Sequence, residues 1–176
     1  RAETEHDGHA VAGSTGSEAP HGIVWHRGTD GESALRTPLP PKELERRLAT
    51  YYRPYHAALA QLLADKQKRF GHAILVCAHS MPSNGTGIGG RVFPRADVVP
   101  GTRGRASASS SLIDEVDAVC RSSGLSVRHD DPYRGGFSTA HYGRPDRGVH
   151  AIQIELARRL YRNEGALWRV PEGGAR

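Results

Sequence analysis

Two short apolar runs constrain the fold of this chain more than any other feature. The runs His72–Ala78 and Val149–Glu155 are rich in aliphatic and β-branched residues, and their carboxyl ends carry His79 and Glu155. Runs of this length and composition, bounded by polar segments, are typical of buried β-strands. We therefore predict two interior strands whose last residues are ionisable.

A long helical pattern precedes the first of these strands. Residues 37–71 carry apolar side chains at helical spacing, which predicts one apolar face made of Leu44, Leu48, Tyr51, Tyr55, Leu59 and Leu62. Pro40 and Pro41 suit the first turn of this helix. Pro54 is expected to kink the helix or split it in two, and Gly71 is placed to end it.

A second amphipathic helix is predicted over residues 109–124. A serine cap begins it, Gly124 ends it, and its predicted apolar side consists of Leu112, Val116, Val119 and Cys120. The other expected elements are a strand, turn and return strand over 22–33, an extended loop over 81–105 with a short strand near 97–99, a strand over 125–129, a loop over 130–148 and a helix over 156–165. This alternation favours an α/β fold, a mixed sheet with helices on both faces.

Composition limits the classes of partner. The 176 residues carry a formal net charge of +5, but the basic residues are scattered and form no run typical of a nucleic-acid surface. No stretch reaches the length of about 18 apolar residues that spans a membrane. Cys77 and Cys120 lie in apolar stretches, which favours reduced core thiols and a cytoplasmic location. We therefore expect neither nucleic acid nor membrane as a partner, and the sequence leaves the oligomeric state open.

His79 and Glu155 are the first candidates for chemistry. A histidine at the end of a buried strand is well placed to bind Zn²⁺ or to act as a base, and the alternative is a histidine hydrogen-bonded at a loop edge. A carboxylate driven to the end of an apolar strand has its pKa raised by desolvation, as a general base requires. The alternative for Glu155 is an acid that favours the dipole of a following helix.

The loop Asp131–Arg147 is the second candidate. It holds several cationic side chains among glycines: Arg134, His141, Arg144 and Arg147 with Gly135, Gly136 and Gly143. Guanidinium groups bind carboxylates in a fork geometry, and glycines let the backbone approach a small ligand. An ordinary solvated basic loop is the alternative.

Three motifs together resemble the N-formylglutamate amidohydrolase (N-formylglutamate deformylase) family. They are HSMPS (79–83), DPYRGGFSTAHYGRP (131–145) and GVHAIQIELARRLY (148–161), and YYRPYHAAL (51–59) is similar to the family's central helix. The resemblance implies a fold like that of the M14 zinc carboxypeptidases with one catalytic zinc. It also implies cleavage of N-formyl-L-glutamate, a small anionic substrate, to formate and L-glutamate, a step in histidine degradation.

The same resemblance implies roles for individual residues. His79 matches the metal-binding histidine, and Glu155 matches the candidate base for the metal-bound water. Arg134, His141, Tyr142 and Arg144 match the loop that holds the acidic substrate, with Arg134 and Arg144 as the expected anchors for its two carboxylates.

The chain departs from the family pattern in two respects. The family expects a preceding region that completes the Zn²⁺ site with a PH-[SA]-G histidine and an acidic residue, so residues 23–170 are interpreted as the C-terminal portion of one amidohydrolase domain, between a flexible arm or loop (1–22) and a tail (171–176). His6 and His9 are weak substitutes for those ligands, because Gly/His-rich arms are usually disordered. Cys77 stands where relatives often carry an acid, and loss of that acid is expected to weaken metal binding.

Two other functions stay open at the level of sequence. One is a catalytically inactive fragment or family member that binds small carboxylates. The other is an amidohydrolase acting on a different N-acyl amino acid, since such substrates also present a carboxylate near an amide.

Overall fold

A computed structural model of the chain describes residues 9–13, 22–28 and 31–164. The expected tail at 171–176 and most of the expected arm at 1–22 lie outside these residues. The chain divides into two compact units, residues 1–68 and residues 69–176. Among the described residues, no helix has both the length and the apolar character needed to cross a bilayer.

The predicted long helix forms, and its prolines act as expected. It consists of α1 (Pro41–Arg47), a five-residue π-helical turn η1 (Leu48–Tyr52) and α2 (Arg53–Phe70), which runs to the start of the second unit. Pro54 has no N–H to offer the preceding turn, and the helix widens immediately before it: the N–H of Arg53 donates to Leu48 O, five residues back. Gly71, with φ +77°, ends α2.

The predicted apolar face of this helix is partly wrong. Leu48 and Leu63 are buried, whereas Tyr51, Tyr55 and Leu62 are about 60% exposed, at 65%, 60% and 58%. The π turn is the physical reason, because one extra residue in a turn rotates all later positions relative to a 3.6-residue repeat. The apolar face of the helix is therefore displaced by one residue after η1.

The expected strand, turn and return strand at 22–33 is reduced to one antiparallel bridge. Arg27 pairs with Ser33, and backbone bonds join Gly28 to Glu32 and Ala34 to His26. A second isolated bridge joins Val11 to Leu39.

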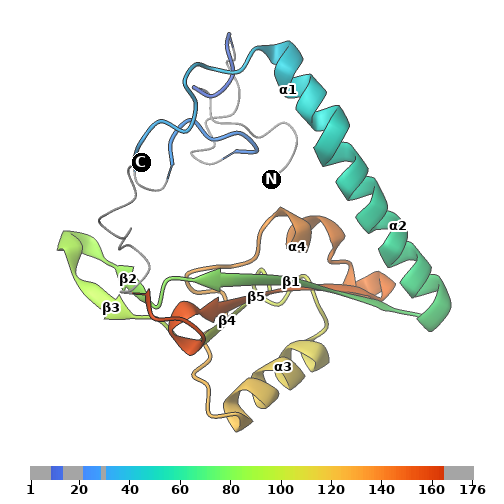
Figure 1. Ribbon diagram of the computed structural model, residues 1–176. Coiled ribbons are helices and arrows are strands. Elements are labelled where there is room, and N and C mark those ends of the chain that lie inside the picture. The colour runs from blue at the N-terminus through green and yellow to red at the C-terminus, as the bar shows by residue number, and fades with distance from the viewer. Residues whose placement is uncertain (1–8, 14–21, 29–30, 165–176) are drawn as a thin grey trace, which may run out of the picture. The chain divides into compact units, whose positions relative to one another are not determined.

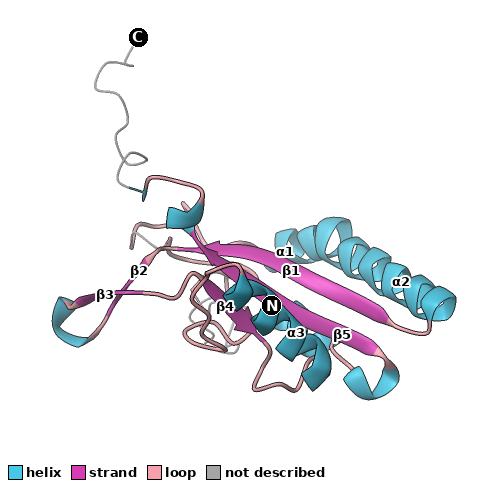
Figure 2. Ribbon diagram, turned by 90° about the horizontal axis from the view of Figure 1, so that it is seen from below, coloured by secondary structure: helices cyan, strands magenta, loops and turns pink. Residues whose placement is uncertain are grey.

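Both apolar runs form strands, as predicted, and the two strands are parallel neighbours. The prediction of two interior strands is wrong for the first run, because that strand lies at the edge of the sheet and its Ile74 and Val76 are 47% and 55% exposed. β1 (Ala73–Met81) pairs with β5 (Val149–Ala157), and β4 (Val98–Gly101) pairs antiparallel with the other edge of β5. The resulting order β1-β5-β4 is a mixed sheet (Figures 1 and 2).

A helix covers each face of this sheet within the second unit (Figure 1). On one face, Ile113 of α3 (Ser110–Ser122) packs with Ile152 of β5, and Ser109 caps α3 as predicted, accepting from the N–H of Leu112. Val119 is 54% exposed, so that part of the predicted apolar side is wrong. On the other face, α4 (Phe137–Tyr142) packs against β5 and β1. The expectation of helices on both faces is confirmed here.

Three local predictions are wrong. The loop after β1 folds into a hairpin of β2 (Asn84–Thr86) and β3 (Val92–Pro94), joined through the 3₁₀ turn η2 (Ile88–Gly90). The segment 125–129 forms a single bridge, Val127 to Val98, rather than a strand. The basic loop contains α4 and a 3₁₀ turn η3 (Pro145–Arg147).

The helix expected over 156–165 is also absent from the described part of that range. β5 continues to Ala157, because its last residues pair with β4, and a 3₁₀ turn η4 (Arg158–Leu160) follows. The backbone N–H of Arg159 donates to Ser83 Oγ, and its guanidinium donates to Asp97 at 2.7 Å. These bonds fix the segment against the loops after β1 and β3.

Asp130 fixes the loop that follows β4. Its carboxylate accepts from Thr102 N (2.6 Å), Thr102 Oγ1 (3.0 Å), Arg103 N (3.0 Å) and Gly104 N (2.8 Å). The loop needs such support, because Arg103, Gly104 and Arg105 all have positive φ. One side chain therefore satisfies the backbone of a strained turn.

This predicts a large effect of a small change at Asp130. Asp130→Asn keeps the size of the side chain, and asparagine tolerates the positive φ of this position. The new N–H₂ group, however, would face backbone N–H donors in place of a carboxylate oxygen. The free energy of unfolding should therefore fall by about 1.5–3 kcal/mol. Urea titration followed by circular dichroism measures it. Asp131→Asn is the control, since its ion pair with Arg128 is largely exposed and such changes stay within about 0.5 kcal/mol. Equal effects of the two variants would contradict the role of Asp130.

Candidate functional site

The parallel pairing of β1 and β5 places His79 directly beside Glu155. The two residues are partners in the register of the pair, each third from the end of its strand. In a parallel pair, residues in register project from the same face of the sheet. The two predicted residues therefore lie together at the carboxyl edge of the sheet, where α/β folds bind ligands.

Glu155 is buried and has an altered affinity for protons. It is 6% exposed, and burial raises the pKa of its carboxyl. The charge of His79, a hydrogen bond from Gln153 and the charges of Arg158 and Arg95 act in the opposite direction without cancelling the effect. The elevated pKa expected for Glu155 from its place in an apolar strand is confirmed, and Glu155 is part of β5 rather than the first residue of a helix.

Gln153 connects Glu155 to the glycine-rich loop, a connection that sequence reasoning missed. Its Nε2 donates to Glu155 Oε1 at 2.9 Å, and its Oε1 accepts from Gly136 N at 2.9 Å. The available signal was the spacing of two residues, which puts both side chains on one face of a strand.

The segment Arg134–Gly136 lies closely against β4. A Cβ added at Gly101 would stand 2.6 Å from Gly135 N, so that only glycine allows this approach. The backbone of the segment is held by Arg103, whose N–H donates to Arg134 O at 2.9 Å and whose guanidinium donates to Gly135 O at 3.1 Å. Among the described residues, the exposed guanidinium of Arg134 forms no hydrogen bond or ion pair.

The other predicted substrate residues belong to α4 and the residues after it. His141 is exposed, stacks on Phe137 with ring centroids 4.8 Å apart, and meets Tyr142 edge-on. Tyr142 is buried at 8% exposure. Arg144 donates to the carbonyls of Ala140 (2.9 Å) and Gly143 (2.6 Å), so its guanidinium already binds the carboxyl end of α4.

Cys77 lies two residues before His79 on the same face of β1 and pairs in register with Gln153. Burial raises the pKa of its thiol. Within the described residues, no three His, Cys, Asp or Glu side chains gather closely enough to hold a metal ion.

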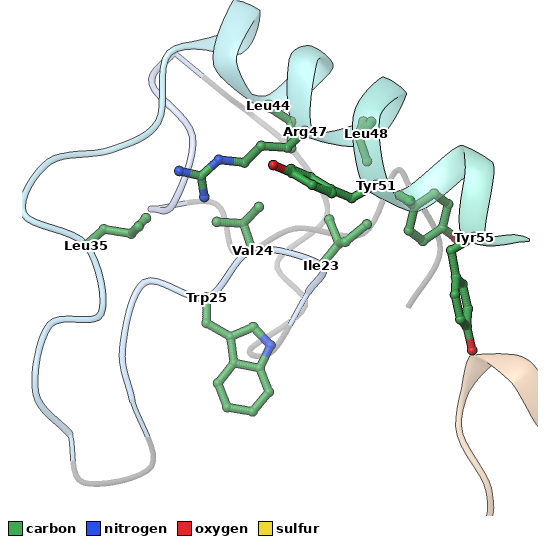
Figure 3. A pocket seen from close by; sticks show the side chains of 10 residues that line it. Ile23, Val24, Trp25, Leu35, Leu44, Arg47, Leu48, Tyr51 and Tyr55 are labelled. Carbon is green, nitrogen blue, oxygen red and sulfur yellow. The ribbon is translucent and has the colours of Figure 1, made fainter.

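A separate pocket of about 640 Å³ lies in the first unit (Figure 3). Its walls are mainly apolar and aromatic, and Arg47 is the one charged residue among those that line it. The lining residues are Ile23, Val24, Trp25, Leu35, Leu44, Arg47, Leu48, Tyr51, Tyr52 and Tyr55. Arg47 is already paired with Glu43 at 2.8 Å. None of the predicted site residues lines this pocket.

Comparison with known proteins gives a consistent family. A family model described as N-formylglutamate amidohydrolase matches residues 1–162. An N-formylglutamate deformylase of Pseudomonas aeruginosa is 36% identical over 140 residues, which cover 78% of this chain and 52% of the relative. One of Pseudomonas putida is 34% identical over 138 residues, covering 77% of this chain and 51% of the relative.

A solved structure agrees with the sequence relatives. The crystal structure of N-formylglutamate amidohydrolase from Ralstonia eutropha JMP134 superposes with a TM-score of 0.73 at 34% identity, covering 82% of this chain and 52% of that one. The chain thus spans about half the length of the curated relatives it matches.

The burial of Glu155 predicts that removing its charge stabilises the metal-free chain. A carboxyl whose pKa is raised by folding contributes stability below its unfolded pKa, and this contribution is lost as pH rises through the folded pKa. In the presence of a chelator, Glu155→Gln should therefore exceed the unchanged chain in free energy of unfolding at pH 7, and the gap should close in acid. Urea titrations at several pH values measure this.

Glu115→Gln provides the matched control, since it removes the same charge from the exposed side of α3. It should produce no comparable gap. A Glu155→Gln variant that is less stable than the unchanged chain at pH 7 would show that burial does not penalise the ionised carboxylate.

Proposed function

Because this chain belongs to the N-formylglutamate amidohydrolase family, we propose that it provides the general base and the substrate loop for hydrolysis of N-formyl-L-glutamate to formate and L-glutamate. The observation that carries the proposal is the buried Glu155 beside His79 at the carboxyl edge of a mixed sheet. In this proposal the reaction is a step in histidine degradation and the fold is like that of the M14 zinc carboxypeptidases.

Glu155 has the environment of a general base. Its raised pKa brings it closer to the range in which a carboxylate both accepts and returns a proton near neutral pH. In the proposed reaction a carboxylate oxygen of Glu155 takes a proton from the attacking water and passes it to the leaving amide nitrogen. The hydrogen bond from Gln153 occupies Oε1, which leaves Oε2 for this proton.

Arg134 is the best supported anchor for a substrate carboxylate. Its guanidinium is exposed, its carbonyl accepts from the N–H of Arg103, and the next two residues are held by the Arg103 guanidinium and by Gln153. Arg144 is proposed as the second cation, and its position depends on the carbonyls that it already binds at the end of α4. His141 and Tyr142, on the same helix, complete the proposed loop.

Zn²⁺ is the proposed cofactor, with His79 as one ligand. Catalytic zinc sites usually have three protein ligands, and the described residues hold no such group, so they do not form the site alone. We therefore propose that the remaining ligands come from outside the described residues. When bound, the ion would polarise the formyl oxygen and acidify water.

The direct test is release of formate from N-formyl-L-glutamate by the purified protein. We expect Glu155→Gln to lower kcat by a factor of about 10²–10⁴, the usual contribution of a general base, while Glu115→Gln leaves it unchanged. A coupled formate assay measures the rates, before and after chelation and readdition of Zn²⁺.

Three results would contradict the proposal in different ways. Full activity in Glu155→Gln removes the assigned base. Binding of N-formyl-L-glutamate without release of formate supports an inactive carboxylate-binding protein instead. Faster cleavage of a different N-acyl amino acid assigns the chain to another substrate.

The anchoring role of Arg134 makes a separate prediction. Loss of a hydrogen bond to a charged group is worth about 1.5–3 kcal/mol, so Arg134→Ala should raise KM for N-formyl-L-glutamate about 10- to 100-fold. The KM of Arg134→Lys should lie between those of the unchanged chain and Arg134→Ala, because lysine keeps the charge and loses the fork geometry of the guanidinium. Arg128→Ala is the control, an exposed arginine paired with Asp131.

A second substrate sharpens this test. N-formyl-L-glutamine lacks the side-chain carboxylate, so its KM should change less in Arg134→Ala if Arg134 binds that group. An equal KM change for Arg128→Ala and Arg134→Ala would contradict the assignment.

A further inference from the structure

The carboxamide of Gln153 touches both the candidate base and the substrate loop. Gln153 is 8% exposed and Glu155 is 6% exposed, so the bond between them is shielded from water. The bond from Gly136 N reaches the other end of the same carboxamide.

The orientation of this carboxamide is determined by its neighbour. The backbone N–H of Gly136 is only a donor, so Oε1 of Gln153 must face it. The N–H₂ end then faces Glu155 and requires an acceptor there, a role that the ionised carboxylate fills. The loop therefore sets how Gln153 presents itself to Glu155.

The loop cannot compensate easily for loss of this bond. Gly135 has φ +96°, and a Cβ there would stand 2.8 Å from Thr139 Oγ1. On its other side Gly101 leaves no room for a side chain. The backbone is thus packed tightly between β4 and α4, and a side chain from β5 holds its amide in place.

We propose that Gln153 is a positioning residue that fixes the distance between the substrate loop Arg134–Gly136 and the Glu155 carboxylate. The inference rests on the proposed function, since it assumes that the loop holds the substrate. It assigns to one buried carboxamide two separable effects: its oxygen positions the loop, and its N–H₂ group positions the base.

Two substitutions separate these effects. Gln153→Glu keeps an oxygen acceptor for Gly136 N but places a second carboxyl against Glu155, where the two groups share one proton and Glu155 is a poorer base. We therefore expect kcat to fall about tenfold or more while KM for N-formyl-L-glutamate stays within about twofold. Gln153→Met has similar size and loses both bonds, so KM should rise about tenfold as well. Gln61→Met, on the exposed side of α2, should change neither constant.

A measurement that does not depend on catalysis tests whether Gln153 positions the loop. In ¹⁵N-labelled protein, hydrogen exchange of the Gly136 amide should be slow in the unchanged chain and in Gln153→Glu, and at least tenfold faster in Gln153→Met. If the unchanged protein releases no formate, the proposed function fails while this readout still tests the bond between Gln153 and the loop.

Two outcomes would overturn the inference. One is unaltered Gly136 exchange in Gln153→Met. The other is the same KM and kcat in Gln153→Glu and Gln153→Met, which would indicate a structural residue whose two bonds have no separate effects. Thermal unfolding of each variant identifies any that fail to fold. Exchange of the Gly136 amide is then compared between Gln153→Glu and Gln153→Met in the protein that remains folded.

Discussion

The parallel pairing of β1 with β5 is the interaction on which the rest of the site depends. Register is the critical property, because a slip of one residue would turn Glu155 to the face covered by α3 and bring Ile154 to the face covered by α4. The contact of Ile152 with Ile113 fixes which face of β5 packs against α3, so Glu155 stays on the opposite face, beside His79. Packing on one face of the sheet thereby fixes the chemistry on the other.

Polar side chains hold the loops around the site through hydrogen bonds to the backbone. Asp130 satisfies the turn after β4, and the side chain of Arg103 within that turn supports Gly135. Gln153 supports the next residue, Gly136. Hydrogen bonds of this kind have strict geometry, whereas apolar contacts tolerate small displacements, so they suit a loop that must hold one position beside Glu155.

The sequence predicted the elements whose signals are local. The two strands are continuous apolar runs, α3 has a serine cap and a terminal glycine, and the prolines mark the start and the disturbance of the long helix.

Other elements depend on distant partners. β5 extends to Ala157 because Val98 pairs with Leu156, and neither the spacing nor the composition of 156–165 reveals this. α4 is six residues long and follows Gly136, which provides no side-chain cap, so it carries no helical signature. The bond between Gln153 and Gly136 joins residues 17 apart in the sequence.

The environment of Glu155 combines opposing requirements in one place. Burial raises the pKa of its carboxyl, which suits proton transfer, but a buried anion without partners would be too costly to form. Gln153 resolves this conflict by donating one hydrogen bond, which stabilises the ionised form without adding a charge that would remove its basicity. A lysine or arginine at the same position would lower the pKa much further. A neutral donor, oriented by the backbone of the loop, therefore preserves the altered carboxyl and ties its position to that of Arg134.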